Sequence, residues 1–266
     1  MKSLTAPIAA ALALCASVTV ADTQDRWTSF AVRGSYEKNT HPLVDTHSRH
    51  LAFDATYAAS DAVNLSFGFA QASPEKSSGA FERLSRFSLG ARYGLGHGGF
   101  VGGFVDVTHY HGGVGADWMT AYGLDAGYEA NGLRTSVFAG FVNDGDLSTY
   151  APTRIYGAKA GIDVMHGVDL GVYYLAEDDN KFHVQQYGVQ VGFHIPRRDG
   201  RSPVHLGAYA GRLGHHGRTF DQVGVTVTYA LRGQAPVGLN QFCEHSVLFN
   251  LYANSGFTEV PNPNPY

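Results

Sequence analysis

Apolar and polar side chains alternate along much of this sequence, and this period of two restricts the chain to β-structure. In the stretch LSRFSLGARY, the side chains of Phe87, Leu89 and Tyr93 fall on one face of an extended chain. Arg86 and Arg92 fall on the other face, because successive side chains of a strand point to opposite sides. Such a strand has one apolar and one polar side. Soluble β-sandwiches and transmembrane β-barrels both contain strands of this kind.

Similar runs recur along the chain and predict about twelve strands. The runs cover residues 27–37, 49–59, 62–71, 83–94, 99–110, 117–129, 133–142, 153–164, 168–176, 181–195, 203–212 and 219–231. Most have roughly 9 to 13 residues, which is enough for a tilted strand to cross a bilayer, whereas soluble strands usually have about five or six. The alternation slips near Gln185 and Gln186, which predicts a β-bulge there.

The expected connections alternate between long and short. Long loops are expected at 38–48, 72–82 and 143–152, and tight turns lie between them, for example at Ser60-Asp61 and around Asn131-Gly132. Outer-membrane barrels join their strands by short periplasmic turns and longer outer loops. A secreted β-sandwich has no reason to alternate its loop lengths in this way. The pattern therefore favours an all-β fold consisting of a single antiparallel transmembrane β-barrel.

The composition agrees with a barrel and excludes two other classes. Charged residues make up 16% of the chain, and 19 basic against 23 acidic residues give no basic surface for nucleic acid. Mean hydropathy is −0.14, and no apolar run after Val20 approaches the ~20 residues of a membrane helix. A barrel strand shows lipid only every second residue, so its average hydropathy is neutral.

The N-terminus predicts export. A lysine at position 2 precedes a short apolar run, and the run ends in small residues at Ala21, which is typical of a signal peptide at 1–21. The barrel is then expected at 22–231, followed by a C-terminal extension at 232–266. Cys243 is the single cysteine left after cleavage, so no intramolecular disulfide is expected.

With this strand count and loop pattern, the chain resembles Gram-negative outer-membrane β-barrels, and among them the small porin-like channels. The resemblance is architectural and covers most of the exported chain. It implies location in the outer membrane, contact with lipid and lipopolysaccharide, and passage of small hydrophilic solutes. No family motif accompanies it, so it assigns no functional residue.

The C-terminal extension departs from the usual end of such barrels, which is an aromatic residue closing the last strand. This chain ends in PNPNPY, and its prolines do not fit a central strand. Residues 232–266 are therefore expected outside the ring of twelve strands. Ser246 to Tyr252 could form a strand or a plug, and pairing with 237–243 would give a barrel of fourteen strands.

Ten charged residues fall on the polar faces of the predicted strands and are the candidate pore-lining residues. They are Arg33, Asp54, Arg86, Arg92, Asp106, Asp125, Arg134, Lys159, Asp163 and Asp169. In a channel, such a lining selects solutes by size and sign. In a filled barrel, the same charges form a stabilising network. Barrels of about eight strands are filled and those of sixteen or more are open, so twelve lies between the two cases. We expect a narrow passive channel, with a non-conducting structural or surface-interaction barrel as the alternative.

Motifs that suggest other chemistry are weak. Gly94, Gly96 and Gly99 match a dinucleotide fingerprint, but a strand follows where the fingerprint needs a helix, so a hairpin turn is expected. His194 and His205, with Ser202 between them in sequence, allow a hydrolase on the barrel wall as a third possibility. No histidine spacing specifies a complete metal site. The sequence therefore predicts no enzyme, no cofactor and no metal.

Overall fold

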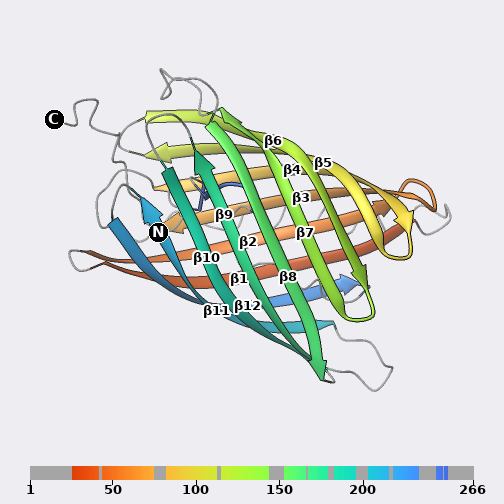
Figure 1. The fold of residues 1–266 in the computed structure, drawn as a ribbon. Helices are drawn as coiled ribbons and strands as arrows, with labels where there is room; N and C mark the ends of the chain where they lie inside the picture. The colour runs from red at the N-terminus through yellow and green to blue at the C-terminus, as the bar shows by residue number, and fades with distance from the viewer. Residues whose placement is uncertain are drawn as a thin grey trace.

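The protein forms a closed barrel of twelve antiparallel strands in the computed structural model (Figure 1). The structure describes residues 26–41, 44–74, 82–112, 115–143, 153–165, 167–178, 183–195, 203–215, 218–233, 244–247 and 249–250. Each strand pairs with its neighbours in sequence, and β12 pairs with β1 to close the ring. No helix in these residues is long and apolar enough to cross a membrane.

The strands have 11 to 16 residues, longer than those of most soluble sheets. They are β1 (Trp27–His41), β2 (Val44–Ala58), β3 (Val63–Pro74), β4 (Arg83–Gly96), β5 (Gly99–Gly112), β6 (Gly115–Ala130), β7 (Leu133–Asn143), β8 (Thr153–Met165), β9 (Val168–Asp178), β10 (His183–Ile195), β11 (Val204–His215) and β12 (Arg218–Arg232). The predicted twelve-strand all-β barrel is confirmed. The fourteen-strand alternative is wrong, because β1 and β12 pair directly and leave no place for further strands.

The outer face of the barrel is apolar. In β4, the side chains of Phe87, Leu89 and Tyr93 are about half exposed, whereas Arg86 on the opposite face is buried. Val223, Val225, Val227 and Tyr229 repeat this outward pattern in β12. Strands that alternate between apolar outside and polar inside place hydrocarbon against lipid and keep charge in the lumen.

Tight turns join the strands at one end of the barrel, which we call the turn end; the opposite end is the loop end. Between β4 and β5, Gly96, His97 and Gly98 have φ values of 82°, 51° and 90°. Asn131 and Gly132, between β6 and β7, have φ values of 52° and 76°. These left-handed residues suit tight hairpin turns. The Gly94–Gly99 motif is therefore a hairpin turn, as predicted.

Most strands extend further toward the loop end than the sequence predicted. Most of the expected loop at 38–48 belongs to β1 and β2, which run to His41 and from Val44. The reason is that both faces of this hairpin are polar: Glu37 is buried inside, and Lys38 forms an ion pair of 3.1 Å with Asp45. Hydrophobic alternation therefore ended the predicted strands too early.

The bulge predicted near Gln185 and Gln186 is also wrong. β10 pairs with β9 and β11 without a register shift across these positions. Val184 points into the barrel and is fully buried there, so an apolar inward residue produced the apparent slip. Within the described strands, the actual register shifts all lie toward the turn end, for example between Gly94 and Gly96 and between Asp163 and Met165.

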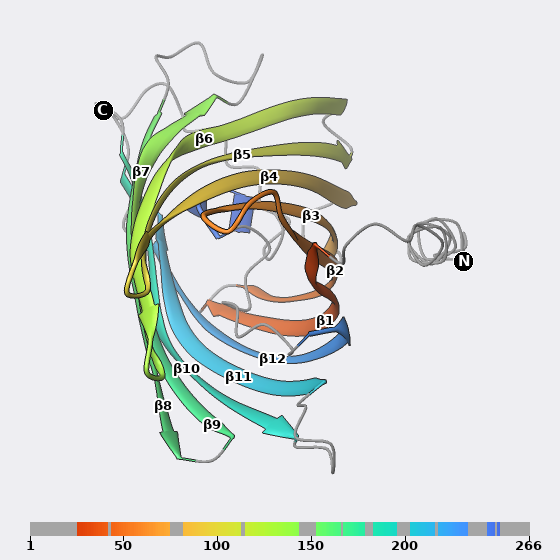
Figure 2. The same cartoon turned by 90° about the vertical axis from the view of Figure 1, so that its right-hand side faces the viewer.

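Residues 244–247 and 249–250, which we call the luminal segment, lie inside the ring (Figure 2). Their side chains contact residues of β5, β8, β9 and β10. Ser246 begins a short turn of helical backbone: its carbonyl accepts the N–H of Asn250 at 3.4 Å, and its hydroxyl accepts the N–H of Phe249 at 3.1 Å. A serine hydroxyl at this position caps the turn.

Because the outer face is assigned to lipid, a charged residue placed on it should lower the free energy of unfolding, and the loss should grow with the depth of the residue in the bilayer. Replacing Leu89, midway along β4, by arginine should lower the free energy of unfolding by about 2–4 kcal/mol. Leu95→Arg, near the turn end, should lower it by about 0–1 kcal/mol. Urea titration of protein refolded into lipid vesicles measures both values. Equal costs for the two variants would contradict the assignment.

Candidate functional site: the lumen

The ten charged residues expected on the polar faces all lie on the inner face of the ring, and each has an oppositely charged or hydrogen-bonding partner there. Four pairs form among them: Arg33–Asp54 at 3.4 Å, Arg86–Asp106 at 3.7 Å, Arg92–Asp125 at 2.8 Å and Arg134–Asp163 at 2.8 Å. Lys159 instead pairs with Glu244, and Asp169 with His205. The lumen therefore presents charges of both signs that are largely neutralised locally.

A glycine on an intervening strand makes room for one of these pairs. Arg92 of β4 and Asp125 of β6 are both register partners of Gly102 on β5. A Cβ at Gly102 would lie 2.5 Å from the Asp125 carboxylate and 2.8 Å from Arg92. Because Gly102 has no side chain, the two charged groups meet across β5.

Water reaches the charges unevenly along the barrel. At the turn end, the side chains of Arg92 and Asp163 are 46% and 48% exposed. Halfway along the barrel, Arg86 and Asp106 are 4% and 1% exposed. The lumen therefore consists of a polar vestibule at the turn end and a closed region beyond it.

Apolar side chains fill much of the loop half of the lumen. The fully buried inward residues there include Leu84, Met119, Val142, Ile155, Leu175, Val184 and Leu213, and they cluster with Val247 and Phe249 of the luminal segment. The sequence prediction missed this cluster because it expected the inward face to be polar throughout. A signal was present, since Val184 and Leu213 occupy inward positions in the alternation.

The luminal segment is attached to the middle of the lumen by charge and stacking. The Nζ of Lys159 donates to the Oε2 of Glu244 at 3.0 Å. The His245 ring lies flat on Phe104, with ring centroids 3.7 Å apart, and its Nδ1 lies 2.8 Å from the Oδ2 of Asp106. Asp106 therefore contacts both Arg86 and His245, and joins the wall to the segment.

Nearer the loop end, a buried hydrogen-bond network holds the segment. The hydroxyl of Ser246 donates to Glu177 at 2.6 Å, and the amide of Asn250 donates to Gln186 at 3.0 Å. Gln186 in turn donates to Gln222 at 2.9 Å, and Gln222 donates to Glu37 at 3.1 Å. Buried polar networks whose members are satisfied fix one arrangement, because any displaced group loses its partner.

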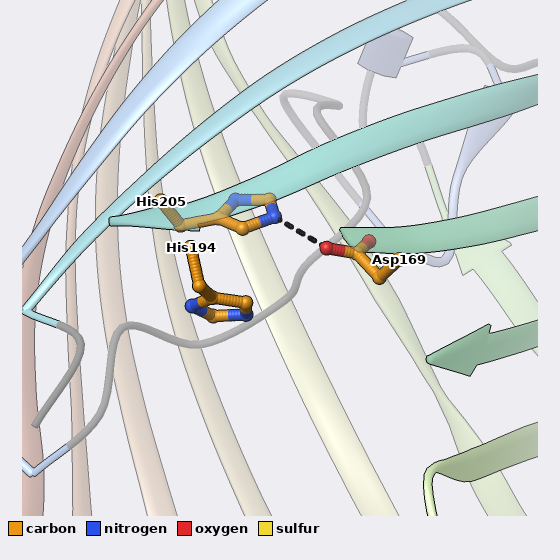
Figure 3. Close-up of side chains that lie close together, drawn as sticks. All are labelled: Asp169, His194 and His205. Atoms are coloured by element: carbon orange, nitrogen blue, oxygen red, sulfur yellow. Dashed lines mark hydrogen bonds and ion pairs between the residues drawn. The ribbon is translucent and has the colours of Figure 1, made fainter. Parts of the chain in front are cut away.

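A second polar cluster lies at the turn end and joins three strands (Figure 3). Asp169 of β9, His194 of β10 and His205 of β11 face one another, and the Nε2 of His205 lies 2.9 Å from the Oδ2 of Asp169. The sequence placed His194 and His205 on adjacent strands but did not associate Asp169 with them. Ser202, the proposed nucleophile of the hydrolase alternative, lies outside the described residues.

A closed barrel with an apolar outside and charged inside is the fold of a porin-like outer-membrane β-barrel. Among solved structures, the chain is similar to an outer membrane channel from Pseudomonas putida F1, with a TM-score of 0.56 and 12% identity over 79% of this chain and 100% of that one. It is also similar to the KdgM porin, with a TM-score of 0.53 and 8% identity over 75% of this chain and 98% of that one. At these identities the likeness concerns the fold. No protein-family model and no curated protein sequence matches the chain.

The buried contact of Asp106 predicts a large loss of stability when it is removed. Asp106→Ala should lower the unfolding free energy by about 3–5 kcal/mol, because it takes away a carboxylate that compensates the buried Arg86. Asp221→Ala is the matched control, since its 2.9 Å pair with Arg212 is exposed and should contribute at most about 1 kcal/mol. Denaturant titration in detergent measures both, and similar losses would contradict this account.

Proposed function

We propose that the protein is an outer-membrane channel for small hydrophilic solutes, closed in this conformation by the luminal segment. The observation that carries the proposal is a continuous ring of twelve strands whose inner face holds exposed charges of both signs at the turn end. A wall of this kind accommodates hydrated solutes. The fold shared with solved channels and porins supports this proposal.

The vestibule would admit solutes from the turn end, which in barrels of this kind faces the periplasm. Arg92 and Asp163 lie at its wall with about half of each side chain exposed. A passage limited by paired charges of opposite sign favours small polar or zwitterionic molecules over ions of high charge. Of the ten candidate residues, four would therefore line the vestibule: Arg92, Asp163, Arg134 and Asp54. Arg86 and Asp106 would lie in the closed region beyond it.

The luminal segment would be the gate. It lies about ten residues beyond β12 in sequence and has no backbone pairing with the wall among the described strands, so its departure would not open the ring. Its contacts with Lys159, Asp106 and Glu177 are side-chain contacts. Displacement of the segment would connect the vestibule with the loop end.

The location and partners of the protein follow from the same proposal. The apolar outer face fits an outer-membrane bilayer, with lipid and lipopolysaccharide around it. Export through a cleaved signal peptide at 1–21 would deliver the chain. We assign it no catalytic role.

A second candidate function is a non-conducting barrel that acts through its loop end. The close packing of Leu84, Met119, Phe249 and their neighbours in the loop half favours it, because filled barrels derive stability from such packing. The two candidates differ in whether the luminal segment can leave.

Planar-bilayer conductance separates them. The full chain from Asp22 onward is compared with Phe249→Glu, which places a charge among buried apolar side chains, and with a chain ending at residue 243. Both changes should raise the frequency or size of discrete current steps by roughly ten-fold or more, since a displacement cost of about 1.4 kcal/mol corresponds to a factor of ten in open population. Arg212→Ala, in the exposed pair with Asp221, is the control and should leave conductance unchanged.

Heat-modifiable migration on gels shows which variants are folded. If folded Phe249→Glu and truncated proteins insert but never conduct, the channel proposal is wrong and the filled barrel is supported. Equal currents from all forms would show that the segment is no gate. In the conducting form, Arg92→Ala should shift ion selectivity toward cations, because it removes an exposed positive charge from the vestibule.

A further inference from the structure

We infer that Asp169, His194 and His205 form a binding site for a divalent transition-metal ion such as Zn²⁺ at the turn end of the lumen. The three side chains each offer one ligand atom, and these atoms all lie within 4.8 Å of one another. They come from three consecutive strands, so the barrel wall itself fixes their spacing (Figure 3). This site is separate from the luminal segment and its proposed role.

The register of the strands explains why the three groups meet. His194 and His205 are directly opposite each other on β10 and β11, and their ring centroids are 4.6 Å apart. Asp169 on β9 is the register partner of Gly192, two residues before His194. Alternating side chains place Gly192 and His194 on the same inner face. Asp169 and His205 therefore approach each other from either side of β10.

Gly192 supplies the space for this approach. A Cβ at Gly192 would collide with the Nε2 of His205 and with both carboxylate oxygens of Asp169. Any other residue at this position would push the two groups apart. The position thus forms a small cradle under the point where the ligand atoms converge.

Two atoms of the cluster remain available to bind a metal ion. Among the described residues, the Oδ1 of Asp169 and the Nδ1 of His194 are buried atoms without a hydrogen-bond partner. Asp169 and His205 are 1% and 3% exposed. A buried carboxylate with an unused oxygen carries a desolvation cost that a bound cation offsets.

The neighbouring charges also favour a cation. Asp163 on β8 is the register partner of Asp169, and like charges directly opposite each other on one face are destabilising. Arg134 neutralises Asp163 through a 2.8 Å contact. A metal ion at the cluster would neutralise Asp169 in the same way. The half-exposed Asp163 side chain shows that water, and hence a hydrated ion, reaches this end of the lumen.

The donor set determines the class of metal. Two imidazole nitrogens and one carboxylate oxygen suit Zn²⁺ and related first-row ions, whereas Ca²⁺ and Mg²⁺ prefer sites made of oxygens. Neighbouring ligand atoms in a tetrahedral zinc site lie about 3.3 Å apart, given bond lengths near 2.0–2.1 Å. Side-chain rotations on metal binding would have to bring the ligand atoms, which now lie within 4.8 Å of one another, to this spacing. Three protein ligands leave a fourth position for water or for a polar solute in the vestibule.

Cobalt and zinc titrations test the site. The chain from Asp22 onward is refolded in detergent, stripped with a chelator and titrated with Co²⁺, whose visible absorption reports tetrahedral nitrogen and oxygen ligands, and Zn²⁺ then competes for the site. We expect one ion per chain. His194→Ala and His205→Ala should each weaken binding at least about ten-fold, since even loss of an outer-shell partner has effects of about this size.

Two further variants sharpen the test. Gly192→Ala should weaken binding without removing a ligand, because the added methyl group fills the cradle. His183→Ala should not, since His183 forms an exposed 3.5 Å pair with Asp178 at the loop end. Heat-modifiable migration identifies folded variants. Of the two histidine-ligand variants, His194→Ala should disturb the fold less, because His194 is only partly buried whereas His205 is buried.

Absence of saturable binding to the folded wild-type protein would overturn the proposal. Binding of equal affinity in wild type, His194→Ala and His205→Ala would overturn it as well, because the ion would then be held by other residues. Neither result depends on whether the barrel conducts, so failure of this site and failure of the channel proposal are distinguishable.

Discussion

A strand in a bilayer has no water to satisfy the backbone groups along its edge, and the whole structure depends on removing that edge. The pairing of β1 with β12, which runs from Ala31 opposite Ala230 to Thr40 opposite Asp221, does this by turning the sheet into a ring. Once the ring is closed, every side chain of a strand points either toward lipid or into the lumen. Strand number then sets the space inside, and twelve strands enclose a volume that their own side chains do not have to fill. The chain fills part of this volume with its own C-terminal residues and leaves a polar vestibule at the turn end.

The inner wall combines charged side chains with glycines, which have no side chain. Charged groups of both signs avoid lipid by pointing inward, where they meet in pairs. Two of these pairs, Arg92–Asp125 and Asp169–His205, span an intervening strand. Gly102 between Arg92 and Asp125, and Gly192 between Asp169 and His205, both lie where a Cβ would prevent the contact. A glycine in a strand normally weakens it, because it adds backbone entropy and packs no side chain. In this barrel the cost is offset by ion pairs that a β-branched residue would prevent.

Sequence alternation was sufficient to predict the strand number, the outer and inner faces, and the turns, because lipid imposes one rule on every strand. It was insufficient wherever lipid is not the neighbour. The polar hairpin around Lys38 and Asp45 has no apolar face to reveal it, and inward Val184 imitated a change of register. The luminal segment is too short to show a period, and its contacts depend on the finished ring. Asp169 could be associated with His205 only once the register across β10 was known.

The luminal segment is covalently joined to the wall that binds it, since about ten residues separate Gly233 from Glu244. A covalent connection makes binding of the segment intramolecular, so its local concentration at the wall does not depend on how much protein the membrane contains. Binding of the segment in the lumen is therefore a unimolecular equilibrium, and its position does not depend on the number of barrels in the membrane. A solute that competes for the contacts of Lys159, Asp106 and Glu177 has to do so against this local concentration. If the lumen opens as proposed, only solutes that are abundant on one side of the membrane, or that bind the wall tightly, would displace the segment, and the covalent connection would set a threshold for their concentration.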